Sequence, residues 1–165
     1  MRISDIQLLY DYNYWANQRI LSKASELSAE QLTQATSHSF DTLLGTITHI
    51  LDSEYVWRDI YLNKRFTSRL VDIEPFLTLE SVKTYWQKEE TAMRAYIDSL
   101  EDNDMDSLLR YEIPEGVAEK VLWHCLVHVV NHGTQHRSEC AVMLTDFGHS
   151  PGSIDFTHFL NERAR

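Results

Sequence analysis

The sequence contains little glycine, proline or cysteine: 165 residues include five Gly, three Pro and two Cys. So few turn-forming residues argue against collagen-like, disordered and loop-rich folds. Two cysteines are too few for a fold that depends on disulfides. Apolar residues make up 43% of the chain, which is enough for a core that needs no such cross-links. We therefore expect residues 1–165 to form a single domain.

Long apolar runs and an excess of basic residues are also lacking. No stretch approaches the roughly 18 apolar residues that a membrane helix needs. The 25 acidic residues outnumber the 15 basic ones and give a net charge of −10, which repels nucleic-acid phosphates and anionic membranes. The N-terminal segment has early acidic residues and no apolar signal core. We therefore expect a cytoplasmic protein without nucleic acid or membrane as a partner.

The two cysteines, Cys125 and Cys140, fall within one predicted helix. Their positions in the sequence place them ~22 Å apart along the axis of that helix. This separation excludes a disulfide between them. We interpret both as reduced thiols that are buried like other small apolar side chains.

Four long segments have apolar residues at three- and four-residue steps, the pattern of amphipathic helices. These segments run from about Ser4 to Leu27, Asp41 to Asn63, Leu79 to Leu100 and Val117 to Phe147. Predicted caps at the helix ends are Ser4 with Gln7, Ser39 or Asp41, Thr78 and Gly148. Four such helices with short links predict an all-α, antiparallel four-helix bundle.

The segments between these helices have less regular patterns. One helical turn is predicted at Ala29–Leu32 and a loop at Lys64–Pro75. The alternation of Leu108–Ile113 predicts a short strand before the fourth helix, followed by a turn at Pro114-Glu115-Gly116. Asp155–Arg165 is expected to form a short helical tail.

The chemistry of the sequence is concentrated in the fourth predicted helix, where four histidines follow one another at four-residue steps. A His-x-x-x-His pair places two imidazoles on adjacent turns, so that both can bind one metal ion. With Leu122 marking the centre of the core face, His136 lies about 40° and His132 about 80° away from it. His128 and His124 lie about 120° and 160° away, toward solvent. His132 and His136 are therefore the candidate ligands, and the alternative is one core and one surface histidine.

A third ligand has to come from another helix, and His49 in the second predicted helix is the leading candidate. His49 lies almost opposite the main apolar stripe of that helix, on a second stripe with Val56 and Ile60. A bundle helix that touches two neighbours can have two such stripes. His49 therefore remains a candidate on spacing alone.

Three segments make the sequence similar to a known family, the DinB/YfiT-like superfamily of metalloenzymes. The matching residues are Asp11-Tyr12-Asn13-Tyr14-Trp15-Ala16-Asn17, Thr48-His49-Ile50-Leu51 with Glu54 and Trp57, and His128-Val129-Val130-Asn131-His132-Gly133-Thr134-Gln135-His136-Arg137. The resemblance covers essentially the whole chain. It implies a four-helix bundle that binds a divalent metal ion through His49, His132 and His136. The family commonly continues His-Arg-Gly-Gln, whereas this chain has Ser138 and Glu139.

The resemblance also implies a type of chemistry. Three imidazoles leave a coordination position open for water or substrate, as in catalytic zinc sites. Zn or Ni is the expected ion, with Fe as an alternative. Thiol transferases in this superfamily imply an enzyme that activates water or a low-molecular-weight thiol, as a transferase or a hydrolase. The alternative is a non-catalytic binding or stress-response module with a structural metal or none. Relatives that form homodimers imply a homodimer here.

Other polar residues have two interpretations each. Glu54 or Asp52 could orient the His49 ring, but a solvated helix face is the simpler explanation. Asn13, Asn17 and Tyr12 could line a pocket or bond helices to one another, and Arg137 could bind a substrate anion or form a surface ion pair. Cys140 is predicted to lie one layer deeper than the histidines, protonated and unable to occupy the open position.

Overall fold

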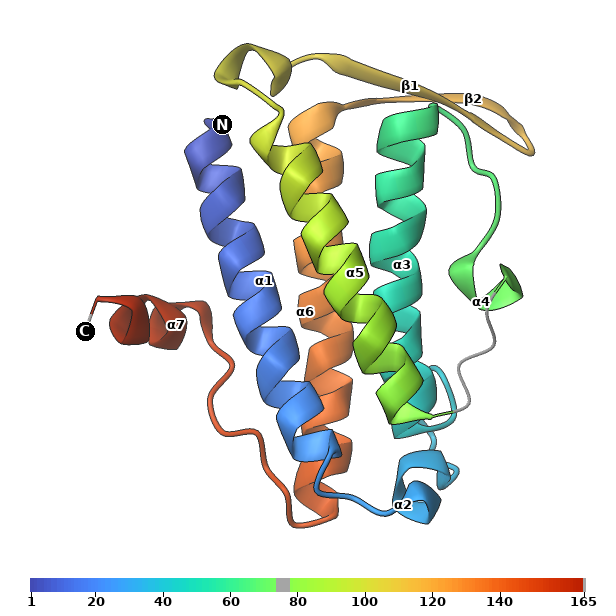
Figure 1. Ribbon diagram of the computed structural model, residues 1–165, viewed down its shortest axis with the longest axis vertical. Helices are drawn as coiled ribbons and strands as arrows, with labels where there is room; N and C mark the ends of the chain where they lie inside the picture. The colour runs from blue at the N-terminus through green and yellow to red at the C-terminus, as the bar shows by residue number, and fades with distance from the viewer. Residues whose placement is uncertain (74–77, 165) are drawn as a thin grey trace.

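The computed structural model describes residues 1–73 and 78–164. Four long helices form a bundle (Figure 1): α1 (Ile3–Ala24), α3 (Leu43–Asn63), α5 (Leu79–Asp98) and α6 (Leu122–Asp146). Helix α6 packs against α1 and α3, and α5 packs against the same two helices. All four predicted helices are confirmed, with ends that differ by a few residues from the expected ones.

Shorter elements connect and flank the bundle. They are α2 (Ala29–Thr33), α4 (Leu70–Ile73), the 3-10 helix η1 (Asp102–Asp104), strands β1 (Leu108–Ile113) and β2 (Gly116–Val121), and α7 (Phe156–Arg163). The predicted turn near Ala29 and the helical tail are confirmed. Part of the predicted loop is the short helix α4, and residues 74–75 of that loop lie outside the described residues. None of the helices in the described part is both long enough and apolar enough to cross a membrane.

The helix directions differ from the antiparallel arrangement that the sequence suggested. Helices α3 and α5 run in the same direction, as Figure 1 shows. Their hydrogen bonds agree with this direction: Trp86 donates to Glu54, and about one turn further along both helices Arg58 donates to Glu89. Helix α3 ends at one end of the bundle, and α5 begins at the opposite end. The links from α1 to α3 and from α5 to α6 reverse the direction of the chain, so the prediction was wrong only between α3 and α5.

The strand predicted at Leu108–Ile113 is confirmed, but its partner was not predicted. Val117–Val121 was assigned to the start of the fourth helix and Gly116 to the preceding turn, whereas Gly116–Val121 forms β2, antiparallel to β1 with Ile113 opposite Gly116. Helix α6 therefore begins at Leu122. The hairpin lies across one end of the bundle, where α3 ends and α6 begins (Figure 1).

Helix caps follow the local hydrogen-bonding chemistry. Thr78 accepts a bond from the backbone N–H of Ser81, as predicted. Helix α3 is capped by Thr42, which accepts from Gly45 N–H, and not by Ser39 or Asp41. Helix α1 begins after Arg2, whose backbone N–H donates to Asp5, so the predicted Ser4 cap was wrong.

The apolar core divides into two clusters along the bundle. One, near the hairpin, includes Ile6, Tyr10 and Leu126, and the other, toward α2, includes Ile20 and Leu144. The residues between them on α1 and α6 include buried polar side chains. This polar layer lies at the level of the histidine cluster described next.

Candidate metal centre

Two of the candidate histidines are presented by one face of α6. His136 is buried and His132 is half-buried, while His128 and His124 are exposed. The ring centroids of His132 and His136 lie 4.5 Å apart. The order of burial along α6 is the one that the helical geometry predicted, and it places the His132–His136 pair against His49 of α3.

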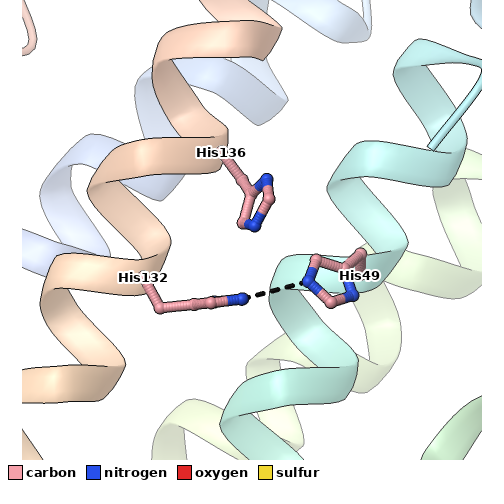
Figure 2. Close-up of side chains that lie close together, drawn as sticks. All are labelled: His49, His132 and His136. Carbon is pink, nitrogen blue, oxygen red and sulfur yellow. Dashed lines mark hydrogen bonds between the residues drawn. The ribbon is translucent and has the colours of Figure 1, made fainter. Parts of the chain in front are cut away.

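His49 of α3 completes the group. Its Nε2 lies 3.0 Å from Nε2 of His132, and its ring centroid is 4.7 Å from that of His136. Figure 2 shows the three rings converging from two helices. One ring nitrogen from each residue lies within 4.8 Å of the others. The second stripe on α3 therefore faces α6, and the structure brings together the three residues that the sequence singled out.

The donor set and its spacing fit a metal ion. Metal–nitrogen bonds of ~2.0–2.1 Å in a tetrahedral centre place two ligand nitrogens ~3.3 Å apart, close to the 3.0 Å between Nε2 of His49 and Nε2 of His132. No carboxylate or thiol of the described residues joins the three histidines as a further ligand. Cys140 lies buried outside the cluster, and burial raises the pKa of its thiol far above the ordinary value, in agreement with the predicted protonated state.

The local electrostatics favour neutral imidazoles, which are the form that binds metals. Burial, reinforced by the charge that His136 can carry, lowers the pKa of His49 to about 4. Burial and the neighbouring His136 and His49 lower the pKa of His132 to about 4 as well. Both rings are therefore unprotonated near neutral pH, with lone pairs available to an ion.

An acidic partner orients one of the rings. Nδ1 of His136 lies 3.3 Å from Oε2 of Glu139, and Ser39 donates to the other oxygen of that carboxylate. Because a carboxylate only accepts, the bond places the proton of His136 on Nδ1 and leaves Nε2 free for a metal. The sequence interpretation missed this role of Glu139, although its position three residues after His136 was the available signal.

Neither acid expected beside His49 orients its ring. Asp52 accepts bonds from Arg69 and from the backbone of Val71. Nδ1 of His49 is buried and has no hydrogen-bond partner in the part of the chain that the structure describes. Its ring instead stacks on Phe40, with centroids 3.7 Å apart. Contact with an aromatic face, and not a carboxylate, holds this imidazole.

A buried polar network lies beside the cluster. Nη1 of Arg137 donates to the side-chain oxygens of Asn13, at 2.5 Å, and Asn17, at 2.8 Å. The amide groups of both asparagines donate to Oε1 of Glu54, and Trp86 donates to Oε2 of the same carboxylate. Arg137 and Glu54 thus face each other across two amides, and the network joins all four long helices.

This network corrects two interpretations and confirms a third. Arg137 was expected at the surface or at a substrate, but its side chain is fully buried. Glu54 was assigned to a solvated face, but it is 1% exposed. Asn13 and Asn17 do bond helices to one another, as the simpler interpretation held. Charge alone predicted exposure for Arg137 and Glu54, whereas paired donors and acceptors make their burial tolerable.

The fold and the cluster define a helical-bundle protein with three converging histidines. The chain belongs to the DinB family, whose model matches residues 3–164. It is 28% identical over 157 residues to protein DinB of Bacillus subtilis (strain 168), covering 92% of this chain and 91% of that protein. It is 23% identical over 126 residues to the uncharacterized protein YizA of the same strain, covering 74% of this chain and 78% of YizA.

The fold also matches a solved structure. A crystal structure of a DinB-like protein from Bacillus cereus superposes with a TM-score of 0.72 and 18% sequence identity. The match covers 92% of this chain and 97% of that one. The helical-bundle architecture predicted from the sequence is therefore confirmed.

Proposed function

We propose that His49, His132 and His136 bind one divalent ion and that the protein is a metal-dependent enzyme. The observation that carries this proposal is the convergence of three imidazoles, two of them with pKa values held near 4, from two helices. No further protein ligand joins them among the described residues. Three ligands leave an open position, which is the arrangement of catalytic zinc sites and not of structural ones.

The donor set favours Zn or Ni, with Fe as the alternative, because neutral imidazoles suit these ions. Such an ion would act as a Lewis acid that lowers the pKa of a water molecule or a low-molecular-weight thiol. The protein's own contribution is to hold the rings: Glu139 fixes the tautomer of His136, and Phe40 stacks on His49. We infer a transferase or hydrolase whose substrate is a small molecule, with a thiol as one candidate.

Metal analysis of protein purified without a histidine tag tests this proposal. We expect about one ion per chain, and no ion in His132→Ala or His136→Ala. His124→Ala is the matched control, because it lies on the same helix, is exposed and stands outside the cluster. Metal-free protein under metal-replete conditions, or equal loss in all three variants, would contradict the proposal and favour a non-catalytic binding module.

We also infer a cytoplasmic homodimer. Large apolar side chains lie exposed around the hairpin end of the bundle, among them Leu62, Leu108 and Val117, and such exposed surface supports self-association. Analytical ultracentrifugation at micromolar concentration should give about twice the chain mass of 19.3 kDa. A single species at the chain mass would contradict the dimer without bearing on the metal site.

A further inference from the structure

A pocket of about 250 Å³ lies beside the histidine cluster, toward the hairpin. It opens between α3, the hairpin and the first turns of α6. Its lining residues are Trp57, Tyr111, Lys120, His124, Cys125 and His128. The proposed metal chemistry uses none of them, so the pocket needs its own explanation.

The walls of the pocket are mainly aromatic. The Trp57 ring centroid lies 6.0 Å from that of Tyr111 and 5.3 Å from that of His128, with the rings inclined to one another. The thiol side chain of Cys125 is buried. An apolar body, and a flat ring in particular, is the ligand type that such inclined aromatic walls contact well.

One cation stands at this pocket. In the hairpin, Lys120 lies opposite Leu109, on the face that carries the buried Leu109 and Tyr111. Lys120 and Cys125 both line the pocket, and the positive charge of Lys120 opposes the rise that burial gives to the pKa of the Cys125 thiol.

No acid neutralises this cation within the hairpin. The neighbouring Glu119 pairs with Arg110, and within residues 1–73 and 78–164 no carboxylate forms an ion pair with Lys120. In a chain with a net charge of −10, a lysine without an acidic partner at an apolar pocket is suited to an external anion.

The pocket connects to the candidate metal centre through its own residues. The His128 ring lies 5.9 Å from that of His132. On α3, Trp57 follows His49 by about two turns, or ~12 Å along the axis. The path from Lys120 past His128 therefore leads toward the three histidines.

We propose that this pocket binds the remote end of the substrate, and that the substrate is a small carboxylate with an aromatic or similarly apolar body. The carboxylate pairs with Lys120, the body contacts Trp57 and Tyr111, and the reacting group extends toward His132. Binding in the pocket itself needs no ion. Only the placement of the reacting group rests on the proposed metal function.

Isothermal titration calorimetry with phenylpropionate tests the pocket in metal-free protein. We expect measurable binding, weakened by about threefold to tenfold in Lys120→Gln or when the probe is the neutral phenylpropionamide. Lys83→Gln is the matched control, because Lys83 is a half-buried lysine on α5 that pairs with Glu80 and lies outside the pocket. No binding, or equal affinities for the acid and the amide, would overturn the proposal.

A second variant separates lost contacts from lost folding. Trp57→Leu keeps a partly buried apolar side chain against the core but removes the aromatic wall, so phenylpropionate affinity should fall at least about tenfold while circular dichroism shows an unchanged helical spectrum. Unchanged affinity in this folded variant would overturn the assignment of the aromatic body.

The link to the metal has its own test. Phenylpropionate with a mercaptomethyl group at the far end of its ring should bind more tightly to zinc-loaded protein than to metal-free protein. Phenylpropionate itself should bind both forms equally. Equal binding of the thiol compound to both forms would overturn the placement of the reacting group. Absence of bound zinc would overturn the proposed function and leave the pocket result standing.

Discussion

Gly133 is the small residue that lets Arg137 enter the bundle. A Cβ at this position would lie 2.6 Å from Nη1 of Arg137 and 2.9 Å from the side-chain oxygen of Asn13. The guanidinium cannot move aside without losing its buried hydrogen bonds. We therefore expect Gly133→Ala to lower the free energy of unfolding by about 2–3 kcal/mol in urea denaturation.

The control for this prediction is Ser138→Ala, an exposed position on the same helix. It should change the free energy of unfolding by less than about 0.5 kcal/mol. If Gly133→Ala were as stable as this control, the burial of Arg137 would not require a residue without a side chain at position 133.

Glu54 gives stability a dependence on pH. Burial raises its pKa from 4.5 to about 7, although the bonds from Asn13, Trp86 and Asn17 oppose the rise. The folded state holds the proton of Glu54 more tightly than the unfolded state does. The contribution of Glu54 to the free energy of unfolding is therefore largest below about pH 4.5. It then falls by about 3 kcal/mol as pH rises through 7.

The test compares wild type with Glu54→Gln by denaturation at several pH values. The amide side chain of this variant cannot ionise, so the free energy of unfolding of wild type relative to the variant should decrease between about pH 4.5 and 7. Only the change of this difference with pH is informative, because Glu54→Gln also weakens the hydrogen bonds that Glu54 accepts, and this loss is the same at every pH. A flat difference would show that Glu54 is ionised throughout this range.

At the scale of elements, the start of α3 links helix capping to the histidine cluster. Thr42 accepts from Gly45 N–H, and the preceding Phe40 stacks on His49. Removal of the cap in Thr42→Ala should lower the free energy of unfolding by about 1 kcal/mol. Thr42→Ser, which keeps the hydroxyl, should retain most of that stability. Equal losses in both variants, measured by thermal denaturation, would assign the effect to the lost methyl group.

The long helices were predictable because each buries a regular apolar stripe. Strand β2 was not, because Gly116–Val121 mixes apolar and charged residues and runs directly into α6. What identifies it is pairing with Leu108–Ile113 across a two-residue turn, a contact that periodicity within one segment does not contain. The direction of α5 was likewise not predictable, because no sequence pattern in residues 64–78 indicates whether the chain reverses there.

The candidate site was predictable to a similar extent. Four-residue spacing and helix geometry selected His132 and His136, but His49 needed the resemblance to known sequences, since spacing left it open. The burial of Arg137 and Glu54 was not predictable from either residue alone. Each is tolerated only because amide groups from another helix lie between them.

At the scale of the whole molecule, a metal ion would connect α3 to α6. An ion that binds the folded state alone stabilises it by about 2.7 kcal/mol at a hundredfold excess over its dissociation constant. We therefore expect zinc to raise the free energy of unfolding of wild type, and chelation to reverse the effect. His49→Ala should lose the zinc effect, while His124→Ala keeps it. An equal zinc effect in both variants would place the binding elsewhere.

The central claim is a centre with only imidazole ligands from the protein and one open position. Absorption spectroscopy of the cobalt-substituted protein tests it most directly. We expect visible cobalt bands and, without added thiol, no intense thiolate-to-cobalt band in the near ultraviolet, with the same spectrum in Cys140→Ser. An intense near-ultraviolet band that disappears in Cys140→Ser would show that this thiol fills the open position, and it would rule out a centre with only imidazole ligands from the protein.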